Sequence, residues 1–129
     1  MATATEFTVT LENRPGTLAG LSEALGSAGI NIDGLQGMPC EGRGAIQLVV
    51  NDPDGAAQAL DGAGIQYTTR EVLLLNLVNE PGALARVTRA MADAGINVDA
   101  VYVTMGQGVV LGVDNLSSAQ QVASELGVA

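Results

Sequence analysis

The spacing of apolar residues changes twice within the first third of the chain. Near the start, apolar and polar residues alternate, which predicts a strand with one buried face. After Asn13-Arg-Pro-Gly16 the apolar residues recur every three or four positions, which predicts a helix with one apolar stripe that Gly29 ends. The apolar members of the strand are Phe7, Val9 and Leu11, and those of the helix are Leu18, Leu21, Leu25 and Ala28.

Two more strands, a second helix and a last strand follow. We expect strands at Ile32 to Met38 and Ala45 to Val50, separated by a glycine-rich turn through Gly42-Arg-Gly44. A helix starts near Asp52-Pro-Asp54, and Ile65 to Thr69 are extended again. The order βαββαβ predicts an α+β, ferredoxin-like fold, an antiparallel sheet with two helices on one face.

The pattern then repeats. Leu11–Asp33 and Leu77–Asp99 align without a gap at an offset of 66 residues, with 12 identities in 23 positions. We therefore predict two domains of the same fold, at 1-70 and 71-129. The second copy has strands from Val98 to Met105 and Val109 to Val113 and a helix from about Ser117 to Leu126. Its closing strand is short or missing, or it is supplied from elsewhere.

The first strand of the second copy is apolar on both faces. Val72, Leu74 and Val78 occupy the face that is polar in the first copy. A sheet face open to water is not expected to carry such residues. Either this face forms an interface with another sheet or subunit, or the other repeat of the same chain covers it.

Composition excludes several classes of function. The chain of 129 residues carries 14 acidic residues against five Arg and no Lys, a net charge of −9, so binding to nucleic acid or to an anionic membrane is not expected. It has no His and a single cysteine, Cys40, which excludes Ser-His-Asp and Cys-His catalysis, structural zinc sites and internal disulfides. We expect a cytoplasmic protein that is not an enzyme and that has no cofactor and no metal.

Two isolated features have ordinary explanations. Cys40 lies on a predicted loop with no His or Lys to lower its pKa, so we interpret it as a free thiol. Asp52, Asp54 and Asp61 lack the dense ligand spacing of a calcium loop and are interpreted as solvated surface.

The helix starts are the best candidates for binding an anion. Pro15-Gly16 and Pro81-Gly82 each precede a predicted helix, whose first N–H groups and dipole favour a carboxylate. Glycine at these positions allows a close approach to the backbone.

The repeated motif Asn-x-Pro-Gly-x-Leu, followed by Gly-Ile-Asn-[Ile/Val]-Asp, resembles that of the ACT domain, a small regulatory module of amino-acid metabolism. The resemblance covers Phe7 to Leu126 and implies domains that pair side by side and bind an amino acid between them. In serine-sensing members two asparagines contact the effector, and they match Asn13 and Asn31, and again Asn79 and Asn97. The site prediction also includes Arg14, Ile32 and Val98.

The chain departs from those members at one position. Leu11 and Leu77 stand where they have a histidine, so serine is not the expected ligand. Arg14 in the first loop corresponds to Glu80 in the second, and we favour the first loop as the anion site. The alternative is that Asn13 and Asn79 are helix caps and that Asn31 and Asn97 are turn residues.

Two functions remain. The first is a non-catalytic regulatory protein that binds an amino acid or related metabolite and acts through assembly or a partner, as a homodimer or higher oligomer. The second is a structural subunit of an amino-acid biosynthetic enzyme, with no ligand of its own.

Overall fold

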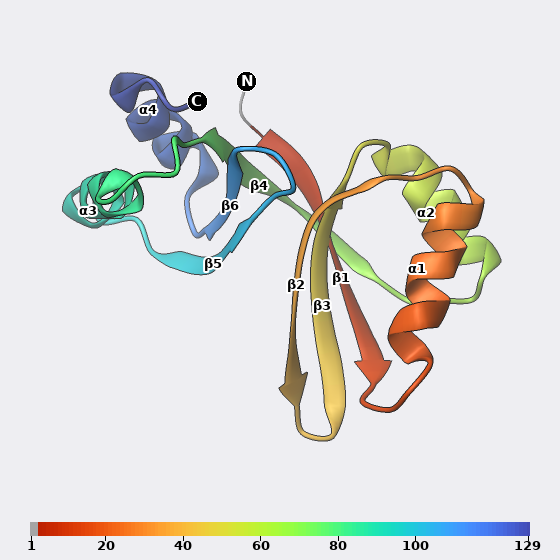
Figure 1. Cartoon of the computed structure of the whole chain (residues 1–129). Coiled ribbons are helices and arrows are strands. Elements are labelled where there is room, and N and C mark those ends of the chain that lie inside the picture. The colour runs from red at the N-terminus through yellow and green to blue at the C-terminus, as the bar shows by residue number, and fades with distance from the viewer. Residues whose placement is uncertain (1–2) are drawn as a thin grey trace. The chain divides into compact units, whose positions relative to one another are not determined.

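The structure, a computed structural model, describes residues 3–129, in which strands and helices alternate along the chain (Figure 1). The residues form two compact units. The first unit is Thr5–Arg70, and the second is Glu71–Ala129 together with Thr3 and Ala4. Met1 and Ala2, which the predicted first domain includes, lie outside the described residues.

The first unit is a small antiparallel sheet covered by two helices. Its elements are β1 (Thr3–Glu12), α1 (Thr17–Ser27), β2 (Ile32–Cys40), β3 (Arg43–Val50) and α2 (Pro53–Gly62). β3 lies between β1 and β2 and pairs antiparallel with both. Helices α1 and α2 contact each other and cover one face of these strands (Figure 1). The core between them comprises Phe7, Val9, Leu21, Leu25, Ile30, Leu48, Val50, Ala56 and Leu60.

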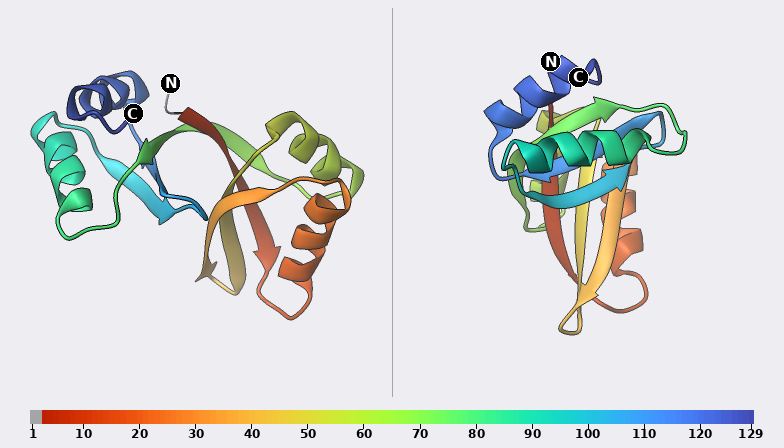
Figure 2. Two further views of the ribbon diagram at one scale, coloured as in Figure 1. Left: turned by 45° about the horizontal axis from the view of Figure 1, so that its top comes forward. Right: turned by 90° about the vertical axis from the view of Figure 1, so that its left-hand side faces the viewer.

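The second unit repeats this arrangement. Its elements are β4 (Thr68–Asn76), α3 (Ala83–Asp93), β5 (Val98–Val103), β6 (Gly108–Val113) and α4 (Leu116–Leu126). β6 pairs antiparallel with β4 and β5, and α3 and α4 cover one face (Figure 2). Its core comprises Leu73, Leu75, Val87, Met91, Ile96, Leu111, Ala119 and Ala123. The α+β prediction, with helices on one face of antiparallel strands, is confirmed.

All four helices end at a glycine with a positive φ. After α1, Gly29 has φ 74°, and the N–H of Ile30 donates to the carbonyl of Leu25 over 3.0 Å. After α3, Gly95 has φ 73°, with the matching bond from Ile96 to Met91. This is the Schellman arrangement, which satisfies the last carbonyls of the helix. The predicted helix ends at Gly29 and Gly95 are confirmed.

Several predicted boundaries were wrong. The hairpin between β2 and β3 turns at Glu41 and Gly42, both with positive φ, so Cys40 ends β2 and Arg43 begins β3. A two-residue turn of this kind matches the twist of the flanking strands, which carries the ladder further than the glycines predicted. Cys40 therefore lies on a strand, not on a loop, and is exposed. β5 ends at Val103, before Met105, which is 88% exposed.

The closing-strand position of each unit is filled in an unexpected way. In the first unit the strands are hydrogen-bonded in the order β2-β3-β1-β4, and in the second unit in the order β1-β4-β6-β5. Within β4, Thr68–Arg70 belong to the first unit and the residues from Glu71 onward to the second. Thr3 and Ala4 of β1 belong to the second unit, and near its C-terminus Val128 accepts a hydrogen bond from the N–H of Asn76 over 2.9 Å. The second unit thus takes residues from both ends of the chain.

The three apolar residues on the second face of β4 have different environments. Val72 is completely buried within this single chain, Leu74 is half-buried, and Val78 is 64% exposed. Val72 is therefore buried without a second molecule, whereas Val78 is exposed to solvent. Among residues 3–129, no helix is long and apolar enough to cross a membrane.

Candidate functional site

Glycine, not asparagine, occupies the cap position of α1 and α3. Gly16 and Gly82 are the N-cap residues, with φ of 96° and 88°, and neither helix has a side-chain cap. The alternative in which Asn13 and Asn79 cap the helices is therefore wrong. The loop before α1 is held instead by Thr17, whose Oγ1 donates to the carbonyls of Glu12 over 2.7 Å and Arg14 over 3.1 Å.

The uncapped start of α1 borders a pocket of about 460 Å³. Glu12, Asn13, Arg14 and Thr17 contribute its polar part, and Arg14 pairs with Glu12. Its apolar part comes from the helix and from the facing strands, through Leu11, Leu18, Leu35, Met38, Pro39 and Ile46. Leu18 belongs to the predicted apolar stripe of the helix but is 47% exposed, because it lies at this pocket and not in the core.

Hydrogen-bonding groups at this pocket are unused. Across residues 3–129, the side-chain amide of Asn13 makes no hydrogen bond, and the first-turn N–H groups of Thr17, Leu18 and Ala19 donate to no protein acceptor. Such N–H groups, at the positive end of a helix dipole, are natural donors to a carboxylate. The pocket therefore combines an apolar wall with free donors.

A matching pocket of about 290 Å³ occurs in the second unit. Asn79, Glu80 and Leu84 take the places of Asn13, Arg14 and Leu18. Here the first-turn N–H of Ala83 donates to the carbonyl of Glu80 over 3.2 Å, so one helix donor is already used. Together with the carboxylate of Glu80, this makes the second pocket less suited to an anion.

The second pair of predicted asparagines lies at the far end of the helices. Asn31 follows α1, where its backbone N–H donates to Oδ1 of Asn51 over 2.9 Å and its side chain donates to Asp33 over 2.8 Å. The N–H of Asn97 likewise donates to Oδ1 of Asp114 over 3.0 Å. These bonds join the start of one strand to the end of its neighbour, which agrees with a role as turn residues.

Asn13 and Asn31 are therefore not brought together within the first unit. The 11 residues of α1 between them span about 16 Å, more than one amino acid can bridge. The same helix length separates Asn79 from Asn97. Of the other predicted site residues, Pro15 and Pro81 are exposed in the loops, and Ile32 and Val98 are half-buried against the cores of their units.

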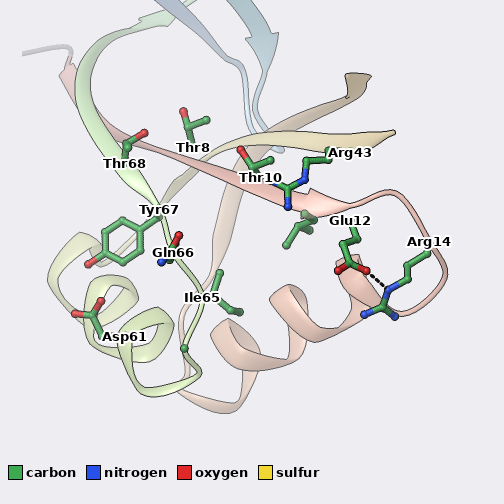
Figure 3. A pocket seen from close by; sticks show the side chains of 12 residues that line it. Thr8, Thr10, Glu12, Arg14, Arg43, Asp61, Ile65, Gln66, Tyr67 and Thr68 are labelled. Atoms are coloured by element: carbon green, nitrogen blue, oxygen red, sulfur yellow. Dashed lines mark hydrogen bonds and ion pairs between the residues drawn. The ribbon is translucent and has the colours of Figure 1, made fainter. Parts of the chain in front are cut away.

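A charged pair marks the end of β1. Nε of Arg14 lies 2.5 Å from a carboxylate oxygen of Glu12, and both side chains are 63% exposed (Figure 3). The hydrogen bond from Arg14 and its positive charge lower the pKa of Glu12, and Arg43 adds a smaller effect in the same direction.

We expect Arg14→Gln to raise the pKa of Glu12 towards its ordinary value, because the substitution removes the hydrogen bond and the nearest positive charge. Arg43→Gln is the control and is expected to raise that pKa less. The measurement is a carboxyl ¹³C titration by NMR. Equal shifts in the two variants would show that the ion pair does not form in solution.

Sequence reasoning missed a second and larger hollow in the first unit. A groove of about 1280 Å³ lies between β1 and the segment Gly64–Thr68 (Figure 3). It is lined by Thr8, Thr10, Leu11, Glu12, Arg14, Arg43, Asp61, Gly64, Ile65, Gln66, Tyr67 and Thr68. The sequence predicted a strand from Ile65 to Thr69, and a strand paired with β1 there would fill the groove. In the structure the strand begins only at Thr68, so the groove beside Ile65–Tyr67 stays open. No cluster of potential metal ligands occurs in the described part of the chain.

Comparisons with known proteins agree with the repeated fold. The protein BT0572 from Bacteroides thetaiotaomicron shares 27% identity, with a TM-score of 0.90 over 98% of this chain and 90% of that one. The regulatory subunit of aspartate kinase from Thermus thermophilus, in its ligand-free form, shares 18% identity, with a TM-score of 0.67 over 96% and 91% of the two chains. The structure of aspartokinase alpha and beta subunits shares 18% identity, with a TM-score of 0.64 over 97% of this chain and 96% of that one.

No curated protein sequence matches the chain. The family model described as "ACT domain pair", however, matches residues 2–126, nearly the whole chain. With its two copies of the βαββαβ unit, the chain belongs to the ACT domain pair family.

Proposed function

We propose that the protein is a non-catalytic regulatory module of the cytoplasm that binds an amino acid or a closely related metabolite. The observation that carries this proposal is the pocket of the first unit, in which unused donors of Asn13 and the start of α1 border an apolar wall. An amino acid presents a carboxylate and an ammonium group beside a side chain, and it needs both kinds of surface.

Each part of the pocket has a role in this proposal. The ligand carboxylate accepts from the first-turn N–H groups of α1, and Arg14 adds positive charge nearby. The Asn13 amide carries a donor and an acceptor, so its oxygen can accept from the ammonium group. Leu18, Leu35 and Met38 contact the ligand side chain. Leu11 replaces the histidine of serine-sensing members, which favours a less polar ligand than serine.

Asn31 and Asn97 take part only if a neighbouring domain brings them to the pocket. Within one unit a helix about 16 Å long separates each of them from the loop asparagine. Members of the ACT family typically pair side by side. Such pairing would place the loop asparagine of one domain near Asn31 or Asn97 of another. We therefore propose that the complete site needs an assembly, as a homodimer or higher oligomer, and that ligand and assembly are coupled.

The relatives support a regulatory role in general terms. One of the similar structures is the regulatory subunit of aspartate kinase, and another contains aspartokinase alpha and beta subunits. At 18% identity, these similarities support only the fold. The proposal therefore depends on the pocket of this chain, and it leaves the choice of enzyme partner to experiment.

Thermal unfolding in the presence of each common amino acid tests the proposal. A true ligand at 100 times its Kd is expected to raise the free energy of unfolding by about 2.7 kcal/mol. Asn13→Ala should abolish most of that stabilisation, because it removes an unused amide at the pocket wall without breaking an internal hydrogen bond.

Asn79→Ala is the matched control, since it makes the same change in the smaller pocket that contains Glu80. It is expected to retain most of the ligand response. If no amino acid at millimolar concentration changes the transition, the sensing function is contradicted. Loss of the response in Asn79→Ala alone would move the site to the second unit.

A second function is favoured by the apolar residues that line the outer strands. Met38 on β2 is 66% exposed and Val103 on β5 is 70% exposed, in pockets of the first and second unit respectively. Exposed apolar side chains on sheet edges are typical of surfaces that meet a partner. A structural subunit that docks on an enzyme would need these residues but not the Asn13 amide.

Sedimentation separates the two functions. Met38→Glu is expected to lower the particle mass if β2 forms a subunit interface, because burying an unpaired charge is costly. Asn13→Ala should leave the mass unchanged in the absence of ligand. A structural subunit would show the first effect and no amino-acid response at all.

A further inference from the structure

The groove beside β1 exposes the end of this strand beyond the part that pairs with β4, where one edge has no partner strand in its unit. The N–H of Asn13 donates to the carbonyl of Gly42 at the β3 hairpin, over 3.3 Å. Because backbone groups alternate along a strand, Leu11 and Val9 also face β3, whereas Thr10 and Thr8 face the opposite edge. That edge borders the groove, with the side chains of Thr8 and Thr10 along it (Figure 3).

The second unit provides an internal comparison. Asn76 is the counterpart of Thr10, and its N–H is occupied by the carbonyl of Val128. The matching hollow, lined by Asn76, Gly127 and Val128, measures only about 180 Å³. In the first unit, Ile65 is the counterpart of Val128, but it makes no such bond to Thr10 in the described chain, and the groove is about 1280 Å³. The same edge is thus closed in one unit and open in the other.

Side-chain packing explains why the first unit does not close its own edge. Ile65 and Tyr67 pack against the core, and the Tyr67 ring lies 5.3 Å from that of Phe7. Desolvation, with a contribution from Asp61, raises the pKa of the Tyr67 hydroxyl, in keeping with its position against the core. Ile65–Tyr67, anchored in this way, border the groove without pairing with β1, and the pairing of β4 with β1 begins only at Thr68. A strand from another molecule therefore has room to enter beside Thr10 and Glu12.

The two ends of the groove carry different charged residues. Glu12, Arg14 and Arg43 line it at the end of β1, where Arg14 pairs with Glu12, and Asp61 lies beside Tyr67 at the other end (Figure 3). Across residues 3–129, Arg43 forms no ion pair, in contrast to Arg14 and Arg70. Two of the five Arg residues of a chain with net charge −9 therefore meet at one end of an open strand edge.

We propose that this groove binds an extended peptide segment of a partner protein, which pairs with the Thr10–Glu12 edge of β1. The segment runs antiparallel to β1, as the neighbouring β3 does. In that direction its N-terminal end lies at Arg14 and Arg43 and carries an acidic residue, and its C-terminal end lies at Asp61 and carries a basic one. Backbone hydrogen bonds supply affinity, and the two charged ends select the direction.

Two blocked hexapeptides of alternating Thr and Val test the proposal. The first has Asp at its first position and Lys at its last, and the second has these two residues exchanged. We expect the first to bind about threefold or more tighter at low salt, and the preference to disappear in about 1 M salt, where charges are screened beyond about 3 Å. Arg43→Gln should remove the preference, while the control Arg89→Gln, whose arginine pairs with Asp93 on α3, should keep it.

Amide hydrogen exchange measures directly whether the backbone N–H groups of this edge are hydrogen-bonded. In the free protein the Thr10 amide is expected to exchange faster than that of Asn76, which Val128 protects. Saturating peptide should slow exchange at Thr10 and leave Val9 and Leu11 unchanged. Methylating alternate peptide nitrogens should abolish binding for the set that faces β1 and spare the other set.

Three results would overturn the proposal. The first is a Thr10 amide already protected in the free protein at low concentration. The second is failure of both peptides to protect Thr10 at millimolar concentration. The third is protection that rises with protein concentration alone, which would assign the edge to a second copy of this chain.

Discussion

Replacing Leu25 with alanine is expected to lower the free energy of unfolding by about 3 to 4 kcal/mol. Leu25 is fully buried on α1, and its carbonyl also accepts the hydrogen bond from Ile30 that ends the helix. The substitution leaves a cavity between α1 and the strands, because the surrounding core relaxes only in part. Urea unfolding followed by circular dichroism measures the change.

Leu18→Ala provides the matched control, since the residue type, the helix and the change in helix propensity are the same. Leu18 is 47% exposed at the pocket, so we expect a loss of about 1 kcal/mol or less. It should weaken ligand binding instead. Equal losses of stability in the two variants would contradict the assignment of Leu18 to the pocket wall.

Arg70→Met is expected to cost roughly 3 kcal/mol, the second largest effect. Nε of Arg70 lies 2.9 Å from a carboxylate oxygen of Glu6, whose side chain is completely buried. Removing the arginine leaves a buried carboxylate without its cation, and the amide of Gln47, 3.4 Å away, compensates only in part. The expected loss is at the lower end of the usual range because Arg70 is 37% exposed.

A double substitution separates the pair from its surroundings. Glu6→Met combined with Arg70→Met removes both charges, and we expect it to recover stability to within about 1 kcal/mol of the natural protein. If Arg70→Met alone costs less than about 0.5 kcal/mol, the pair behaves as an exposed ion pair and its burial has no energetic consequence.

Local features of the sequence predicted the secondary structure well. Gly29 and Gly95 end their helices because only glycine adopts a positive φ without strain, and that requirement is visible in the sequence. Asp52 caps α2 by accepting from the N–H of Gly55, as its position before Pro53 indicates. The antiparallel strands with helices on one face follow from the order of these elements.

The candidate site was harder to predict because its parts come from distant segments. Leu18 and Leu25 have the same helical spacing, and only the placement of β2 shows that the first lies at a pocket and the second in the core. Likewise Asn31 looks like a binding residue in sequence, but its hydrogen bond to Asn51 depends on how two strands meet. Periodicity identifies a face of a helix and does not identify its neighbour.

The division of β1 between the two units has a consequence for synthesis on the ribosome. Thr3 and Ala4 leave the exit tunnel before Glu71–Ala129, although they belong to the same unit. At about 5 to 20 residues per second, they wait several seconds or more for their partners while Thr5–Arg70 can already fold. During that interval Thr3 and Ala4 form a strand end that waits for its partner, and chaperones or another nascent copy can reach it first.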